Sequence, residues 1–242
     1  MSLLLEDQRS TGDPQRIARL TGVLFLVTYV TSIPALFLYH PVLHDARYIV
    51  GTGADGRVSL GAVLELFLIV ANVGTAVVLY PILKRQHKGL ALGFVTARIV
   101  ESAFIAIGIV SLLAVITLRR SATGADAGLV PIGKALVAIH NWTFVLGPGF
   151  VVGIGNGLIL GYLMYRSGLV PRRMAMLGLV GGPLICVSGI AVVLNVIGRG
   201  SAGQAIATIP EFFWELSLGI YLTFKGFKAA PVIAIGTASS AQ

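Results

Sequence analysis

Six apolar stretches, each long enough to cross a lipid bilayer, recur along this chain of 242 residues. A helix that spans the hydrocarbon core needs about 20 predominantly apolar residues. The stretches are 17–38, 58–80, 90–118, 135–165, 174–197 and 209–224. Only 12% of the residues are charged, whereas a soluble domain of this size carries far more charge on its surface. We therefore expect an all-α integral membrane bundle of six transmembrane helices.

The distribution of Lys and Arg predicts the orientation of these helices, because cytoplasmic connections retain positive charge. The side of the N-terminus holds eleven basic residues: Arg9, Arg16, Arg19, Lys84, Arg85, Lys88, Arg166, Arg172, Arg173, Lys225 and Lys228. The opposite side holds six: Arg47, Arg57, Arg119, Arg120, Lys134 and Arg199. We therefore expect both termini in the cytoplasm, with residues 1–15 as an N-terminal segment, 16–228 as the transmembrane domain and 229–242 as a mobile tail. The net charge of +8 then reflects topology and contact with lipid head groups, and it gives no support to nucleic-acid binding.

A run of glycines lies inside the fourth apolar stretch, where Gly149, Gly153, Gly157 and Gly161 recur every four residues. A phosphate-binding loop would need a preceding strand and free backbone amides, and a bilayer admits no such strand. Spacing of four instead places the glycines near one helix face, where a neighbouring backbone can approach closely. The pattern predicts a helix-packing seam, either within the chain or between protomers.

Pro148 stands beside the first of these glycines and is expected to kink or break the helix, because it lacks a backbone donor and clashes with the preceding turn. Two interpretations follow. The seam serves tight packing alone, or the helix is discontinuous and its freed backbone groups line a ligand site, as in many transporters.

Several ionisable residues fall inside the predicted spans, where each costs about 2.5 to 3.5 kcal/mol on insertion scales, and they are therefore functional candidates. Arg98 and Glu101 are three residues apart, so they can pair on one helix face. The last span is expected to begin at Pro210, which places Glu211 near its edge and Glu215 one turn further in. If the polar faces point inward, one buried cluster forms from Glu65, Asn72, Arg98, Glu101 and Glu215, with His140 and Asn141 toward its outer rim.

Two interpretations of this cluster remain open. In the first, Arg98 locks the carboxylates into a structural network that fixes the helix register. In the second, three carboxylates facing one arginine form a pocket that favours a proton, a cation or an amine.

Signals for metals, cofactors and catalysis are weak. His40 and His44 have the spacing of a zinc pair, but Pro41 follows the first and no third ligand is assured, so no metal is expected and the cofactor is unknown. The single cysteine, Cys186, excludes an internal disulfide and a cysteine-based metal site. Nucleophile-elbow and metalloprotease motifs are missing from the sequence, which leaves an enzymatic function without support.

The segments "VANVGTAVVLYPILK", "ARIVESAF", "HNWTFVLGPGF" and "PEFFWELSLGIYLTFKGF" resemble a bacterial multi-pass membrane family catalogued as a domain of unknown function, numbered four-three-eight-six. The likeness runs from about Arg16 to Lys228. It implies an all-helical protein of the bacterial inner membrane and carries no activity with it.

Three hypotheses for function follow. The first is binding or transport of a proton, a cation or a small amphipathic molecule, with Glu65, Glu101 and Glu215 as candidate sites and Arg98 as their organiser. The second is an accessory or sensor protein that packs against a partner through the glycine seam. An intramembrane enzyme is the third and last. The expected partners are the lipid bilayer, a small ligand or ion, and a second copy or another membrane protein.

Overall fold

The computed structural model describes residues 13–51, 53–121 and 128–230, and within them it contains helices and no strand. The long helices are α2 (Pro14–His44), α3 (Asp55–Leu83), α4 (Lys88–Ser121), α5 (Leu129–Phe144), α7 (Arg172–Val193) and α8 (Ala202–Lys225). A short turn, η1 (Tyr48–Val50), follows α2. Two π-helical segments, η2 (Val145–Val151) and η3 (Gly153–Leu160), join α5 to the short helix α6 (Gly161–Ser167). The expected all-α class is confirmed for the described residues. The N-terminal segment and the tail expected from the sequence lie almost entirely outside them.

Five helical segments are long and apolar enough to cross a membrane: α2, α3, α4, the continuous segment Leu129–Ser167, and α7. They indicate an integral membrane protein. The sixth expected span, α8, has 24 residues but is not among these five, because its glutamates and neighbouring polar residues lower its mean hydropathy.

Most helices extend beyond the predicted boundaries, because capping groups and tolerated prolines lengthen them. The side chain of Asp13 accepts a hydrogen bond from the backbone of Gln15 at 3.0 Å and starts α2. The cap of α8 is Ser201, whose hydroxyl accepts from the backbone of Gln204 at 3.4 Å. Pro210 therefore lies inside α8 and not at its first position, as a membrane helix can accommodate.

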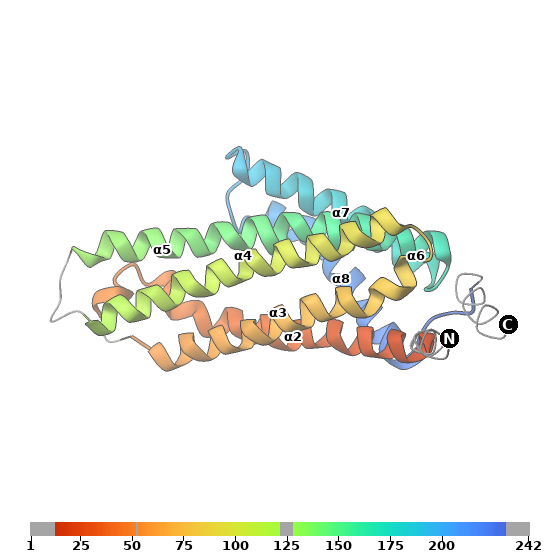
Figure 1. The fold of residues 1–242 in the computed structure, drawn as a ribbon. Helices are drawn as coiled ribbons and strands as arrows, with labels where there is room; N and C mark the ends of the chain where they lie inside the picture. Colours follow the sequence, from red (N-terminus) through yellow and green to blue (C-terminus); the bar gives the residue numbers. More distant parts are fainter. Residues whose placement is uncertain (1–12, 52, 122–127, 231–242) are drawn as a thin grey trace.

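The start of α2 and the end of α8 lie at the same end of the bundle (Figure 1). We call this the terminal end; it holds the start of α2, the turn 84–87, the turn 168–171 and the end of α8. The opposite or far end holds residues 45–51, 53–54 and 194–201. At the terminal end, the side-chain amide of Gln15 donates to the carbonyl oxygen of Phe227 at 2.9 Å and accepts from its backbone nitrogen at 3.0 Å. The start of the first helix is thereby joined to the segment after the last.

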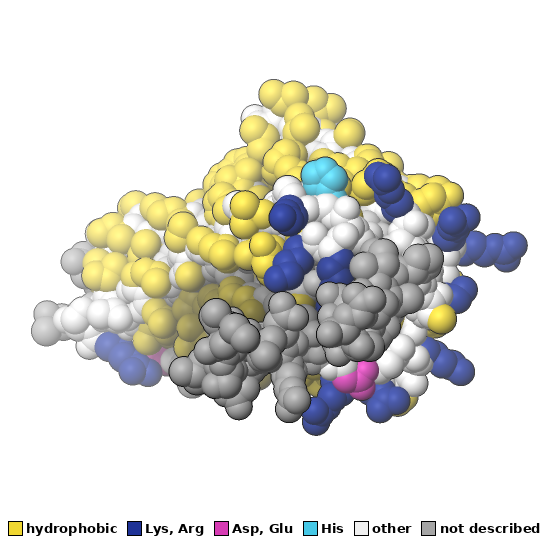
Figure 2. Space-filling model, turned by 45° about the vertical axis from the view of Figure 1, so that its right-hand side comes forward, with side chains coloured by type: hydrophobic (Ala, Val, Ile, Leu, Met, Phe, Trp, Pro, Cys, Tyr) yellow, Lys and Arg dark blue, Asp and Glu magenta, His cyan; other side chains and the backbone are white. Residues whose placement is uncertain are grey.

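Basic side chains gather around the terminal end, and hydrophobic side chains cover the flanks beside it (Figure 2). Described basic residues near this end are Arg16, Lys84, Arg85, Lys88, Arg166, Arg172, Arg173, Lys225 and Lys228. A basic end next to an apolar flank is the pattern that a membrane–water boundary produces.

The helices form a closed ring. Each packs on the next in the order α2, α3, α4, then α5 with η2 and η3, then α7 and α8, and α8 returns to pack on α2. Side chains that point into this ring are enclosed by protein even though the outside faces lipid. The ring therefore supplies the only surroundings in which polar groups at membrane depth can find partners.

The interior of the ring is layered along its axis. One hydrophobic core fills the terminal end and includes Phe25, Leu79, Phe94 and Leu218. A second core fills the far end around Tyr48, Val58 and Leu112, and a smaller one lies around Ile105. Each helix that contributes to both regions carries its buried polar residues between them, so the polar side chains form a layer between two apolar ones.

The fourth span does not break at Pro148. The chain changes from α-helical to π-helical hydrogen bonding at Val145, and the helical segment continues to Ser167. The π-helical turns accommodate Pro148, which has no backbone N–H to donate. Two carbonyl oxygens of the π-helical segments also accept bonds from neighbouring helices. The thiol of Cys186 donates to Phe150 at 3.5 Å and the indole of Trp214 donates to Asn156 at 2.9 Å.

Three of the four spaced glycines lie against α7. Gly153 and Gly157 approach the backbone of Gly182, and Gly161 approaches Gly178 and Leu179. Gly149 has no such neighbour; a methyl group there would meet only the carbonyl of Phe144, at 3.3 Å. The seam is therefore a close contact between η3 and α7 within one chain.

Replacing Gly182 with Ala should destabilise this contact by about 1 to 3 kcal/mol, because overpacking a close backbone contact costs that much. The added methyl group would lie 2.6 Å from the carbonyl oxygen of Gly153 and 2.9 Å from the backbone nitrogen of Leu158. The matched control is Gly189→Ala on the same helix, where the nearest atom is 3.6 Å away. Thermal unfolding in detergent should separate the two variants; equal melting temperatures would contradict the packing role.

Candidate functional site

Arg98 of α4 is the centre of the polar layer and is only 2% exposed. Its Nη1 donates to Glu101 Oε2 at 2.8 Å and to Asn72 Oδ1 at 3.3 Å. The amide of Asn72 in turn donates to Glu101 Oε1 at 2.9 Å. Arginine, glutamate and asparagine thus form a closed triangle that joins α3 to α4. The Nε and Nη2 atoms of Arg98 have no hydrogen-bond partner among the described residues.

Two aromatic rings border the guanidinium on the terminal side. Its central carbon lies 5.2 Å from the ring centre of Phe25 and 5.9 Å from that of Phe94. Cation–π attraction at such distances offsets part of the cost of removing the charge from water. Both rings belong to the terminal hydrophobic core, so Arg98 lies at the border between this core and the polar layer.

Two glutamates of α8 face this centre. Glu215 Oε1 lies 3.8 Å from Arg98 Nη2, which is an ion-pair distance and longer than a hydrogen bond. Glu211 is 2% exposed, and neither of its carboxylate oxygens has a hydrogen-bond partner among the described residues. The sequence placed Glu211 near the edge of a span; the earlier start of α8 brings it into the interior instead.

Glycines make room for the Glu211 carboxylate. A methyl group at Gly157 would lie 2.7 Å from Glu211 Oε2, and one at Gly181 would lie 2.9 Å from the same atom. The backbone nitrogen of Glu211 is also 2.5 Å from that added position at Gly181. The glycine seam and the acidic cluster therefore adjoin each other, because glycines of η3 and α7 have no side chains and leave space for the Glu211 carboxylate.

Tyr29 and Asn156 complete the layer. The hydroxyl of Tyr29 on α2 donates to the carbonyl oxygen of Phe212 on α8 at 2.6 Å. This hydrogen bond helps to set the position of α8 along α2. Asn156 on η3 is fully buried, and both polar atoms of its amide have no hydrogen-bond partner among the described residues. Its unpaired amide and the unpaired carboxylate of Glu211 lie on segments that pack against each other. The layer thus contains buried polar atoms that its internal hydrogen bonds leave unpaired.

A second polar group lies nearer the far end. Tyr39 of α2 donates to Glu65 Oε2 at 2.9 Å, and its ring contacts the ring of His140 edge to face at 5.5 Å. Glu65 and His140 are both buried. The structure therefore places the expected cluster members in two groups: Asn72, Arg98, Glu101 and Glu215 meet in one, while Glu65 and His140 meet at Tyr39 in the other. Asn141 adjoins His140 at the border of the second group and also lines a cavity at the far end.

A surface network at the far end ties α3 to α4. Asp55 accepts from Arg119 Nη1 at 2.8 Å, from Arg120 Nε at 3.1 Å and from the hydroxyl of Tyr48 at 3.0 Å. Burial and the bond to Asp55 raise the pKa of Tyr48 from 10.0 to about 12, so the phenol donates throughout the neutral range. This network is complete and needs no ligand.

The weak metal candidates do not form a metal-ligand set. The rings of His40 and His44 stack with their centres 4.2 Å apart, and His44 Nδ1 lies 3.1 Å from the backbone oxygen of His40. Within the described residues, no three His, Cys, Asp or Glu side chains are arranged to hold a metal ion.

Four side chains of the two polar groups were missing from the site predicted by sequence: Glu211, Asn156, Tyr29 and Tyr39. A signal existed for Glu211 and Asn156, since both are polar residues within or near an apolar stretch. The tyrosines gave none, because a tyrosine near a span end is also typical of the membrane interface.

The family model of the Domain of unknown function (DUF4386) matches residues 20–226. The chain belongs to this family. The match includes α2 from residue 20 onward and all of the other long helices, and it contains both polar groups. None of the curated proteins and none of the solved structures matches the chain. The chemistry of this DUF4386 member must therefore be argued from its own site.

Replacing Arg98 with Gln should destabilise the protein by about 3 to 5 kcal/mol, because removing one partner leaves buried acids without a counter-charge. Arg120→Gln is the matched control. Its side chain is 63% exposed, and Asp55 keeps Arg119 as a partner, so the loss should stay below about 1 kcal/mol. Thermal unfolding of both variants in detergent is the measurement. Similar small shifts in the two would show that Arg98 does not hold the layer together.

Proposed function

We propose that this protein binds protons at the cluster of Glu101, Glu211 and Glu215 around Arg98 and moves them across the membrane. The observation that supports this most directly is Glu211, a buried carboxylate with both oxygens unpaired among the described residues. An ionised carboxylate in such surroundings is very costly, while its protonated form carries no charge to compensate. One guanidinium can balance only one of the three acids. Proton binding is the simplest way for the other two to occupy the layer.

A proton suits this site better than a metal cation. Calcium takes six to eight oxygen ligands, and magnesium requires nearly ideal octahedral geometry. The carboxylates here come from two helices that approach Arg98 from different sides of the ring, and Glu211 lies against glycines of η3 and α7. An organic cation is the second candidate, since a protonated amine could form an ion pair with an ionised Glu211 and balance its charge.

The group at Tyr39 supports a route to the far end. Glu65 lies seven residues from Asn72 on α3, which is two helical turns or about 10 Å along the axis. Glu65 and His140 can therefore carry a proton between the Arg98 cluster and the far end, with Tyr39 holding Glu65 in place. Chains of Glu and His residues at membrane depth are typical of proton relays.

The alternative hypotheses lose support by comparison. A partner protein would need the glycine seam on the outside, whereas Gly153, Gly157 and Gly161 face α7 of the same chain. An enzyme would need a nucleophile or a paired acid and base around a substrate site, and the polar groups described above supply no observation in its favour.

We further propose that the chain crosses the bacterial inner membrane six times, with both termini in the cytoplasm and residues 16–228 as one transmembrane domain. Three observations support this. The helix α8 closes the ring between α7 and α2, the start of α2 and the end of α8 lie at one end, and that end is the more basic one.

Reporter fusions test this topology. Fusions at Gln86 and Gly168, both at the terminal end, should report a cytoplasmic location, and a fusion at Gly198 should report an external one. An alkaline phosphatase fusion is active only outside the cytoplasm, so activity at Gly198 alone is the expected result. Activity at Gln86 or Gly168 would reverse the orientation.

Proton flux tests the function. Purified protein in phosphatidylcholine vesicles with a trapped pH-sensitive dye should dissipate an imposed pH difference faster than vesicles without protein. Glu211→Gln should reduce the rate to that of protein-free vesicles, because an amide cannot exchange the proton. Glu211→Asp should retain flux, since it keeps an acid at the site.

Asp13→Asn is the control for this experiment. It removes an exposed acid at the terminal end while asparagine still caps α2. Its flux should equal that of the unchanged protein. Unchanged flux in Glu211→Gln, or no flux above protein-free vesicles in the unchanged protein, would refute the proposal.

A further inference from the structure

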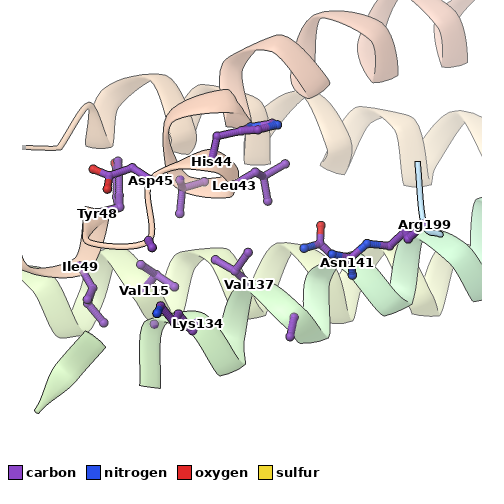
Figure 3. Close-up of a pocket in the computed structure, with 14 residues that line it drawn as sticks. Leu43, His44, Asp45, Tyr48, Ile49, Val115, Lys134, Val137, Asn141 and Arg199 are labelled. Carbon is purple, nitrogen blue, oxygen red and sulfur yellow. The ribbon is translucent and has the colours of Figure 1, made fainter. Parts of the chain in front are cut away.

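A cavity of about 290 Å³ opens at the far end, separate from both polar groups (Figure 3). It lies between the end of α2 with η1 on one side and α5 on the other, with Arg199 of the α7–α8 connection at its rim. Its volume is near the lower limit of about 300 to 1,000 Å³ that small-molecule sites occupy. A head group with part of a chain would fill it.

Two kinds of side chain line this cavity. One wall is apolar and includes Val42, Leu43, Ile49, Val115 and Val137, contributed by α2, η1, α4 and α5. The polar side chains of the lining are Lys134, Asn141 and Arg199 together with His44, Asp45 and Tyr48. A ligand that satisfies both must itself have an apolar part and a polar part.

Two of these polar side chains, Lys134 and Arg199, are cations. Neither Lys134 nor Arg199 forms an ion pair with a carboxylate among the described residues. Lys134 and Asn141 are seven residues apart on α5 and so share one face. Figure 3 shows Arg199 beside Asn141, with the carboxylate of Asp45 at the opposite end of the cavity. Asp45 is also engaged locally, since its Oδ1 accepts from the backbone nitrogen of Arg47 at 2.8 Å.

We infer that this cavity binds an anionic amphiphile, a molecule with one carboxylate or phosphate head and an acyl chain. Arg199 supplies charge-assisted hydrogen bonds for the head, Asn141 beside it adds a neutral donor, and Lys134 on the same face of α5 adds positive charge to the cavity. The apolar wall receives the first part of the chain. Exposed Leu194 and Val196 precede Arg199 in the same connection, so the rest of the chain continues along a lipid-facing surface.

Equilibrium binding of radiolabelled laurate tests this inference, with the full chain in phosphatidylcholine nanodiscs and empty nanodiscs as the blank. We expect one saturable site per chain. The double variant Lys134→Gln with Arg199→Gln should weaken laurate binding about 10-fold, as the loss of charge-assisted bonds to the head requires. Both side chains are exposed, so the fold should survive, and an unchanged melting temperature verifies it.

Arg120→Gln is the matched control, because this exposed cation lies at the same end but does not line the cavity. It should bind laurate as the unchanged protein does, and dodecanol should show no saturable site that depends on the two cations. No saturable laurate site, equal binding in the double variant, or equal weakening in Arg120→Gln would each overturn the inference.

A competition arm identifies the source of the ligand. Adding phosphatidylglycerol to the nanodiscs should displace laurate if the natural ligand is a membrane lipid. Persistent laurate binding in its presence would assign the cavity to free single-chain acids. Neither result depends on proton flux, so this inference and the proposed function can fail separately.

Discussion

A single guanidinium within a membrane bundle imposes the strictest physical requirement on this structure. Arg98 cannot lose its charge and is buried far from either end of the bundle, so the neighbouring helices must stabilise the charge in place of water. Asn72 and Glu101 supply hydrogen bonds, Phe25 and Phe94 supply aromatic faces, and α8 supplies acids. The ring of six helices is the architecture that lets all of these groups face one point.

Packing and chemistry depend on each other at the contact between η3 and α7. Close approach of Gly157 and Gly182 brings two backbones together, and the same bare surface, with Gly181, leaves the space that Glu211 occupies. The π-helical turns of this span free carbonyl oxygens that Cys186 and Trp214 then bind from outside. A feature that would weaken an isolated helix thus becomes a set of attachment points, as π-helical turns at functional sites often are.

The two ends of the bundle differ in what they leave unsatisfied. At the terminal end, apolar packing and the pairing of Gln15 with Phe227 close the structure. The far end keeps a completed ion network at Asp55 beside a cavity whose cations, Lys134 and Arg199, form no ion pair among the described residues. The unpaired cations of the cavity and the unpaired polar atoms of the Arg98 layer lie at different depths in the bundle. We therefore treat them as sites for different ligands.

The sequence by itself determined the helical class, the approximate position of each long helix and the pairing of Arg98 with Glu101, because these follow from hydropathy and from spacing along one helix. Only the tertiary structure decided which acids share a site. Glu65 meets Tyr39 rather than Arg98, and Glu211 enters the interior because a serine cap starts α8 early. Gly149 lies outside the seam, because no atom of α7 is near it, whereas Gly153 and Gly157 approach Gly182. Such outcomes depend on contacts between segments distant in the chain, and periodicity along a single helix carries no information about them.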